Sequence, residues 1–280
     1  MRFAVTVLLW LFTTVTLAVA VPTAWAQTHI VDVDGYTAMA KKASSDPVLQ
    51  AAAASELTTR AMVLINHRGY KVDSAQVHDV ATGYTAGPDF PPQFADANRL
   101  AHSWMFTGAS ARSEGDQWVI DLAGMLKDNA FTSMLSTYNV QVPETVRVPV
   151  TVSTPKVLQP GILRPLATWG PWVSVVAAVL TGIGALLTLT AARSRGRALA
   201  GLGVSALLVG AAGWTAIETA RLRINDALND TTGDIRRIAD IMVSEAESSL
   251  HQWLDLTLAA GGALVVLGVL LALLGSLRKS

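Results

Sequence analysis

Residues 169–192 read WGPWVSVVAAVLTGIGALLTLTAA and contain no Asp, Glu, Lys or Arg. A helix needs about 20 apolar residues to cross the hydrocarbon core of a bilayer, where it must satisfy its own backbone hydrogen bonds. Three further stretches of similar length carry no charge, namely residues 3–21, 198–217 and 256–277. The sequence therefore predicts a mainly α membrane protein with four transmembrane helices.

The composition of the whole chain agrees with a membrane protein. Of its 280 residues 51% are apolar and only 15% are charged, against about 25% in soluble domains. Basic and acidic residues balance at 21 each, so the charge gives no reason to expect a nucleic-acid partner. The chain has no cysteine, which excludes disulfides, thiolate metal sites and cysteine nucleophiles.

Charges and tryptophans at the ends of the spans predict the orientation of the chain. The short link between the second and third spans carries Arg193, Arg195 and Arg197, and cytoplasmic loops are enriched in such residues. With four spans, Arg2 and Arg278 fall on the same side as these topology-setting arginines. We therefore expect a multi-pass plasma-membrane protein with both termini in the cytoplasm. The tryptophans expected to anchor the opposite interface are Trp25, Trp169, Trp172, Trp214 and Trp253.

The first span has two interpretations. Ala24-Trp25-Ala26 resembles a signal-peptide cleavage site, and cleavage there would remove residues 1–26. The apolar run of residues 3–21 is, however, longer than the 7–15 residues usual in a signal peptide. We favour a retained transmembrane anchor. Either interpretation leaves the residues that follow outside the cytoplasm.

Residues 27–165 form the longest segment between two spans, and their pattern predicts a small extracytoplasmic α+β domain. Asp46-Pro47 is typical of a helix start, and an apolar stripe at helical spacing follows it as far as Gly69, which is expected to end the helix. Further helices are expected after the breakers at residues 88–92 and over residues 122–138.

Two strands and a tether complete the predicted domain. Residues 117–122 have the composition of a strand, and residues 144–152 alternate valine with polar residues or proline. Residues 153–165 contain three prolines and a glycine, so we expect them to be an irregular connection to the second span.

Residues 219–252, between the third and fourth spans, carry two apolar stripes at helical spacing. Thr231 and Asp234 resemble a capping box at the start of the second stripe. We expect an extracytoplasmic helical hairpin whose apolar stripe packs on the outer domain. The predicted organisation is an anchor (1–26), an outer α+β domain (27–165), a second span (166–192), a cytoplasmic loop (193–197), a third span (198–218), the hairpin (219–252), and a fourth span with the cytoplasmic tail (253–280).

Small residues four positions apart recur within the spans, a spacing that lets transmembrane helices approach closely. We favour packing within one chain over contacts between chains, and the oligomeric state stays open. The pairs are Ala206 and Gly210, Ala259 and Ala263, and Gly268 and Ala272.

Several short motifs carry a resemblance to a known group. They are Trp25 followed by Val31-Asp32-Val33-Asp34-Gly35-Tyr36, then Ser45 to Gln50 running into Glu56-Leu57-Thr58, Phe94 to His102, and Val119-Ile120-Asp121-Leu122. In these motifs, and in its order of anchor, outer domain and further spans, the chain resembles actinobacterial integral membrane proteins of uncharacterised function. The resemblance implies a retained first helix, and it carries no catalytic residue over to this sequence.

The polar residues give few candidates for chemistry. The five histidines lack metal-site spacing, and the sequence has no nucleophile elbow, phosphate loop or dinucleotide fingerprint. The candidates for a ligand or an acid–base role are His102, Asp116 and Asp121, and we favour a structural or solvent-exposed role for each. The carboxylate pair Asp32 and Asp34 is interpreted in the same way. No ionisable residue lies at mid-membrane, which disfavours a carrier or a pump. We expect no cofactor and no metal.

These observations predict a non-catalytic integral membrane protein of the cell envelope, whose outer module docks or supports a partner membrane or envelope complex. The alternative is an extracytoplasmic enzyme, or a receptor for a cell-envelope small molecule or lipid, with a cleft between the outer domain and the hairpin. The expected partners are the lipid bilayer and other membrane or envelope proteins.

Overall fold

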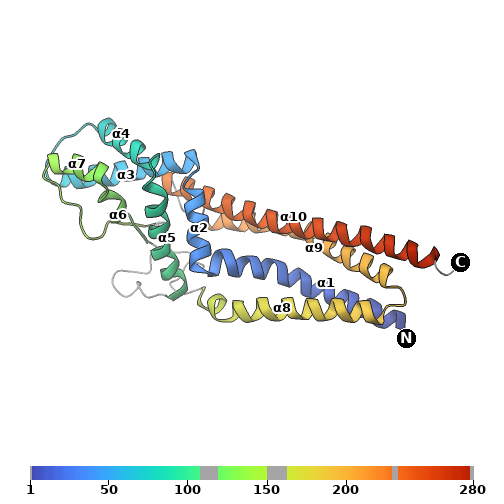
Figure 1. Ribbon diagram of the computed structural model, residues 1–280. Coiled ribbons are helices and arrows are strands. Elements are labelled where there is room, and N and C mark those ends of the chain that lie inside the picture. Colours follow the sequence, from blue (N-terminus) through green and yellow to red (C-terminus); the bar gives the residue numbers. More distant parts are fainter. Residues whose placement is uncertain (1, 108–118, 150–162, 229–232, 278–280) are drawn as a thin grey trace. The chain divides into compact units, whose positions relative to one another are not determined.

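The computed structural model describes residues 2–107, 119–149, 163–228 and 233–277 of the chain (Figure 1). The chain divides into two compact units. The first unit combines Met1–Thr28, Leu166–Arg223 and Glu247–Ser280, and the second combines His29–Pro165 and Ile224–Ala246. The divisions at residues 223 and 246 fall inside helices, so α9 (Arg195–Ala227) and α10 (Gly233–Leu277) each contribute to both units.

The first unit consists of long apolar helices. They are α1 (Arg2–Ala26), α8 (Arg164–Ala191), α9 (Arg195–Ala227) and α10 (Gly233–Leu277), of which α9 and α10 extend into the second unit. Four candidate spans, Ala4–Val31, Arg164–Ala191, Arg195–Asp226 and Gly233–Ser276, are long and apolar enough to cross a membrane. The chain is therefore a mainly α membrane protein with four candidate spanning helices, as the charge-free stretches predict.

Glycines bring α9 and α10 into close contact. A Cβ atom added at Gly203 would lie 2.6 Å from the carbonyl oxygen of Gly261, and one added at Gly196 would lie 2.5 Å from the backbone nitrogen of Ala272. A Cβ atom at Gly268 would likewise meet the backbone of Gly196 at 2.6 Å. These contacts run antiparallel along the two helices at intervals of seven residues. The pair Gly268 and Ala272 thus serves packing within the chain.

The other predicted pairs divide between packed and exposed positions. A Cβ atom at Gly210 would meet the side chain of Leu258 at 2.6 Å, and Ala206 faces Gly261, so this pair also packs within the chain. Ala259 and Ala263 are exposed on α10.

Polar side chains join α1 to α9 inside the same unit. The indole nitrogen Nε1 of Trp10 donates to the carbonyl oxygen of Gly201 at 2.8 Å. One turn further along both helices, the hydroxyl oxygens of Thr14 and Ser205 are 2.7 Å apart. Ser205 is fully buried. A hydroxyl pair can satisfy both groups where no water is present, so these contacts fix the register of the two helices.

The second unit is built mainly from shorter helices, with one small sheet. The short π-helix η1 (Gln27–Val31) precedes it and overlaps its start. Strands β1 (Val119–Asp121) and β2 (Arg147–Pro149) pair antiparallel, with Ile120 opposite Val148. Its elements are α2 (Val33–Ala43), α3 (Pro47–His67), α4 (Ser74–Thr85), α5 (Phe90–Thr107), β1 (Val119–Asp121), α6 (Ala123–Leu126), α7 (Asn129–Thr137) and β2 (Arg147–Pro149).

The helix that begins at Pro47 confirms the clearest local prediction for this unit. Asp46 is its N-cap, and the side chain accepts from the backbone N–H of Val48 at 2.7 Å. Gly69, just beyond the helix end, has a φ of +82°, which glycine adopts without the strain that a Cβ atom would cause.

Other boundaries differ from the prediction for identifiable reasons. The helix expected over residues 122–138 is two helices, because the side chain of Asp128 caps a new start by accepting from the N–H of Ala130. The helices α2 and α4 were not predicted. The two strands are only three residues long, and most of the tether over residues 153–165 lies outside the described residues, as does Thr231 of the expected capping box.

A single apolar core holds the second unit together. Its fully buried side chains include Leu49, Leu57, Phe90, Phe131 and Leu135. The stripe on the first turns of α10 packs against this core through partly buried side chains, which confirms that the tip of the hairpin packs on the domain. The packed residues of α10 are Ile235, Ile238, Ile241 and Met242.

Candidate functional site

His102 lies on α5 and contacts the end of the π-helix η1. Its Nε2 is 3.0 Å from the carbonyl oxygen of Ile30. Carbonyl groups in the last turn of a helix lack an intrahelical donor. Since a carbonyl oxygen can only accept, this hydrogen bond requires a proton on Nε2 of the neutral ring. His102 therefore satisfies a helix end and joins α5 to the segment that leads into α2.

The ring of His102 is buried among aromatic side chains. Its centroid is 4.3 Å from that of Phe106, with the two rings stacked, and 5.2 Å from that of Tyr36. Burial lowers the pKa of His102, against the opposing effects of the carbonyls of Ile30 and Val31 and the charge of Asp32. Burial also raises the pKa of Tyr36 to about 12. Both side chains are therefore neutral at pH 7.

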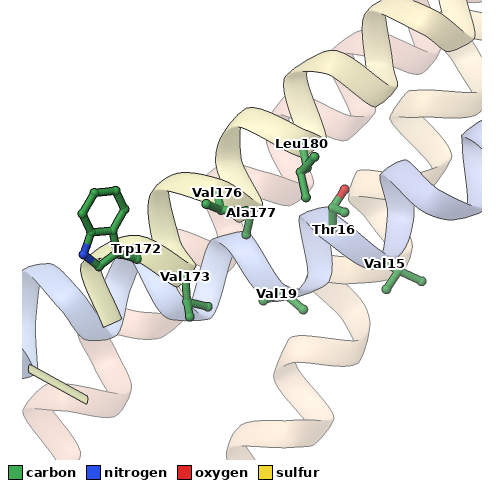
Figure 2. Close-up of a pocket in the computed structure, with 8 residues that line it drawn as sticks. All are labelled: Val15, Thr16, Val19, Trp172, Val173, Val176, Ala177 and Leu180. Carbon is green, nitrogen blue, oxygen red and sulfur yellow. The ribbon is translucent and has the colours of Figure 1, made fainter. Parts of the chain in front are cut away.

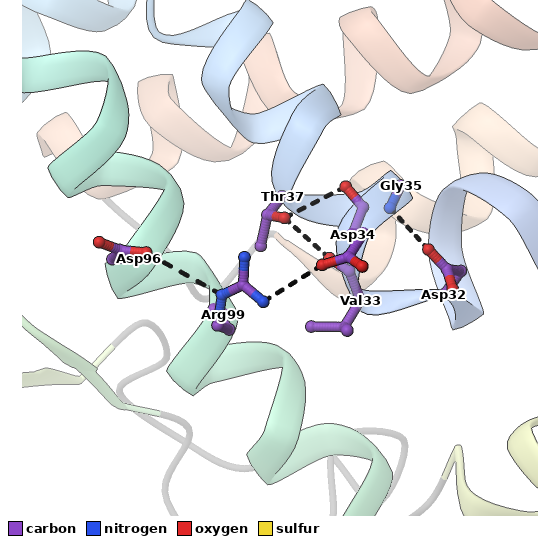
Figure 3. A network of polar contacts seen from close by, with 7 residues as sticks. All are labelled: Asp32, Val33, Asp34, Gly35, Thr37, Asp96 and Arg99. Carbon is purple, nitrogen blue, oxygen red and sulfur yellow. Dashed lines mark hydrogen bonds and ion pairs between the residues drawn. The ribbon is translucent and has the colours of Figure 1, made fainter.

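The carboxylates of Asp32 and Asp34 have separate structural partners (Figure 3). Asp32 caps α2 by accepting from the backbone N–H of Gly35 at 2.8 Å. Asp34 pairs with the guanidinium of Arg99 at 3.3 Å, and Asp96 lies 3.9 Å from the same group. Asp34 and Arg99 are exposed, and such surface pairs contribute about 0–1 kcal/mol to stability. This network connects α2 to α5 at the surface.

Asp121 fixes the backbone beside the small sheet. Its Oδ1 accepts from the N–H of Ala123 at 2.9 Å and from the N–H of Val146 at 2.8 Å. The carboxylate thus links the start of α6 to the residues that lead into β2. These bonds are separate from those of His102, so the two candidates belong to different local networks. Asp116, the third candidate, lies outside the described residues.

A hydrogen-bonded chain that the sequence analysis missed lies beside the core. The hydroxyl of Tyr84 donates to Oε1 of Gln93 at 2.9 Å, and Nε2 of Gln93 donates to Oδ2 of Asp128 at 3.1 Å. Burial, followed by the charges of Asp128 and Asp89, raises the pKa of Tyr84 well above its usual value. The only local signal was the N-cap pattern at Asp128. These hydrogen bonds connect α4, α5 and the N-cap of α7, and the polar groups bond to one another.

The predicted interface tryptophans divide into exposed and packed side chains. Trp169, Trp172 and Trp214 are 66%, 69% and 45% exposed, as side chains that face lipid would be. Nε1 of Trp25 donates to the hydroxyl of Ser249 on α10 at 3.2 Å. Trp253 is partly buried. The ring of Trp214 also lies 4.0 Å, centroid to centroid, from that of His251.

Charged and polar groups also lie near the ends of the long helices. The side chains of Arg193, Arg195 and Arg197 are exposed. Oε1 of Glu247 is 3.8 Å from Nε of Arg221, close enough for charge attraction but too long for a hydrogen bond. Within the described part of the chain, this oxygen and Oε1 of Gln27 are the buried side-chain atoms without a hydrogen-bond partner.

Among the described residues, no group of three or more His, Asp or Glu side chains is placed to hold a metal ion. A comparison of the chain with protein-family models, with curated proteins and with solved structures finds no match.

Proposed function

We propose that this chain is a non-catalytic integral membrane protein of the cell envelope, whose second unit lies outside the cytoplasm and docks a partner envelope protein. One observation carries the proposal: both polar candidates that the structure describes are hydrogen-bonded to backbone groups. His102 is bonded to the Ile30 carbonyl, and Asp121 to the N–H groups of Ala123 and Val146. A catalytic acid or base must instead reach a substrate with a pKa matched to its task.

The orientation in this proposal follows from charge and aromatic side chains. Three exposed arginines crowd the link between α8 and α9, and short cytoplasmic loops are enriched in such residues. Exposed tryptophans at the start of α8 and toward the end of α9 favour the opposite interface. The second unit is then a small extracytoplasmic domain of helices with one two-stranded sheet, and both termini are cytoplasmic.

The docking surface that we assign is the exposed side of α5. Leu100 is 59% exposed there, and its neighbour Arg99 presents a half-exposed guanidinium. Arginine and large apolar side chains are favoured in protein interfaces, where the apolar group is buried and the charge sets the register. The carboxylates of Asp34 and Asp96 lie 3.3 Å and 3.9 Å from the guanidinium of Arg99, beside Leu100.

The rival function, an enzyme or receptor, needs a cleft between the domain and the hairpin. Ile235, Ile238 and Met242 of α10 instead pack against the core of the second unit. Apolar side chains thus fill the place where that cleft was expected, and this favours the docking proposal.

The proposal is tested by complementing a deletion strain with variants of the full chain. We expect Leu100→Asp to lose function at a normal protein level, because the charge disrupts an apolar contact. Val63→Asp is the matched control, since Val63 is 55% exposed on α3, and it should retain function. His102→Gln, which keeps a side-chain N–H donor, should also retain function. A folded His102→Gln variant without function, together with a functional Leu100→Asp variant, would support the enzyme or receptor instead.

A further inference from the structure

An apolar groove runs between α1 and α8 inside the first unit (Figure 2). Its volume is about 370 Å³, which lies within the range of small-ligand sites. Val15 and Val19 line it from α1, and Trp172, Val176 and Leu180 line it from α8. The hydroxyl of Thr16, which also faces the groove, donates to the carbonyl oxygen of Phe12 at 3.0 Å and so presents no unsatisfied polar group.

Close contacts between the two helices bound the groove at both ends. Beyond Leu180, a Cβ atom at Gly184 would lie 2.5 Å from the hydroxyl oxygen of Thr13. Before Trp172, a Cβ atom at Gly170 would lie 2.5 Å from Oε1 of Gln27. The helices therefore touch at these two levels. Between them, the small side chain of Ala177 lies at the buried floor of the groove.

The length of the groove along α8 is close to the thickness of one bilayer leaflet. Eight residues separate Trp172 from Leu180, a rise of about 12 Å along a helix. Half of the hydrocarbon core is about 15 Å thick. Trp172 is 69% exposed, and tryptophan favours the interface between the headgroups and the hydrocarbon. The groove thus begins at the level of the interface and ends near the middle of the membrane.

The two ends of the groove differ in polarity as the two ends of a lipid do. At the outer end, the indole of Trp172 carries an N–H donor. The other walls are mainly valine, leucine and alanine side chains. The helices on both sides are long and apolar enough to cross a membrane, and a groove on their surface is then open to lipid acyl chains.

We propose that the groove between α1 and α8 is a binding site for one acyl chain of a membrane phospholipid, with the headgroup at the level of Trp172. The groove differs from the rest of the lipid-facing surface. An acyl chain on the outer face of either helix contacts that one helix only. A chain in the groove touches α1, α8 and the floor at Ala177 together, and each added contact lengthens its residence.

The test uses the full chain reconstituted in nanodiscs of phosphatidylcholine and phosphatidylglycerol. A fraction of the phospholipid carries a photoreactive diazirine in its acyl chain, and labelled peptides are mapped by mass spectrometry after illumination. Residues 266–274 of α10 serve as the reference, since Val266, Leu270 and Leu274 are exposed apolar side chains outside the groove. We expect labelling of residues 15–19 and 172–180 to exceed the reference severalfold. As the labelled fraction rises, labelling should saturate at the groove and stay linear on α10.

A matched pair of variants locates the site. Val176→Phe places a ring in the groove and should reduce labelling of the groove peptides to the reference level. Val179→Phe adds the same ring at a position on α8 that is 53% exposed and outside the lining, and should leave labelling unchanged. Linear labelling in both regions, equal loss in both variants, or a second copy of the chain cross-linked across the groove would overturn the proposal. The saturation measurement needs only the unmodified chain.

Discussion

The two units place their large apolar side chains in opposite ways. In the first unit, leucines on α10 such as Leu270 and Leu274 are 51% and 60% exposed, and glycines face the neighbouring helix. In the second unit, Leu126 and Phe131 are fully buried, and the exposed positions are mainly polar. The difference follows from the solvent. Water drives apolar groups inward, whereas lipid gives no such force between helices, so close packing and hydrogen bonds hold them together.

The largest effect is expected at the glycine contact between α9 and α10. Gly261→Leu would force a side chain into the backbone of α9, because a Cβ atom there already lies 2.9 Å from the carbonyl oxygen of Gly203. We expect a loss of about 3 kcal/mol or more, the upper range for overpacking. The measurement is thermal stability in detergent, followed by size-exclusion chromatography.

The neighbouring residue provides the control for this variant. A Cβ atom at Gly262 meets nothing within 4 Å, so Gly262→Leu should leave the thermal stability unchanged. Equal destabilisation by the two substitutions would contradict the close contact of α9 and α10.

The second unit should respond to a charge rather than to added volume. Ile238→Asp puts a carboxylate against the apolar core, at a cost of about 3 kcal/mol. Limited proteolysis in membranes should then cut the second unit sooner, while Ser244→Asp, at an exposed position of the same helix, should change nothing. If the two variants resisted protease equally, the stripe on α10 would not belong to this core.

Local patterns were enough to predict the long apolar helices, the cap at Asp46 and the packing of the hairpin tip. They failed for α2 although its buried side chains Tyr36, Met39, Ala40 and Ala43 recur at helical spacing, so a signal was present in the sequence and was missed. They also failed for the glycine contacts, because the small-residue spacing does not tell which helix will be the neighbour.

The roles of the candidate polar residues depended on partners far away in the chain. The carbonyl that His102 contacts lies 72 residues earlier, at the end of a π-helix that no sequence pattern indicated. Asp121 binds the N–H of Val146, 25 residues later. A polar side chain at a given position can be a catalyst or a backbone cap, and only the fold brings the partner that decides between them.

His102 predicts a pH dependence confined to the second unit. Its pKa is lowered by burial, so the folded state binds fewer protons than the unfolded chain, whose histidine titrates near pH 6.5. The stabilising effect is therefore complete above that pH and is lost as the pH falls toward the folded pKa. Amide hydrogen exchange of α5 and α2 between pH 8 and pH 5 measures it. His102→Gln should flatten the profile, and an unchanged profile in that variant would assign the pH dependence to another group.

The smallest effect is expected for the surface network in Figure 3. Arg99→Ala removes two exposed ion pairs and should cost less than about 1 kcal/mol. Chemical denaturation monitored through the second unit measures this change. A loss above roughly 2 kcal/mol would show that the network stabilises the folded state by more than exposed ion pairs do.

The proposed function requires that the first unit spans the membrane and that the second unit lies outside the cytoplasm. Because the chain has no native cysteine, single cysteines report directly on their side of the membrane. Ser74→Cys lies at the exposed start of α4, and Ser194→Cys lies in the arginine-rich link between α8 and α9. In intact cells, a membrane-impermeant maleimide should label the cysteine at position 74 at once and the cysteine at position 194 only after permeabilisation. Labelling of position 194 but not position 74 in intact cells would contradict the claim.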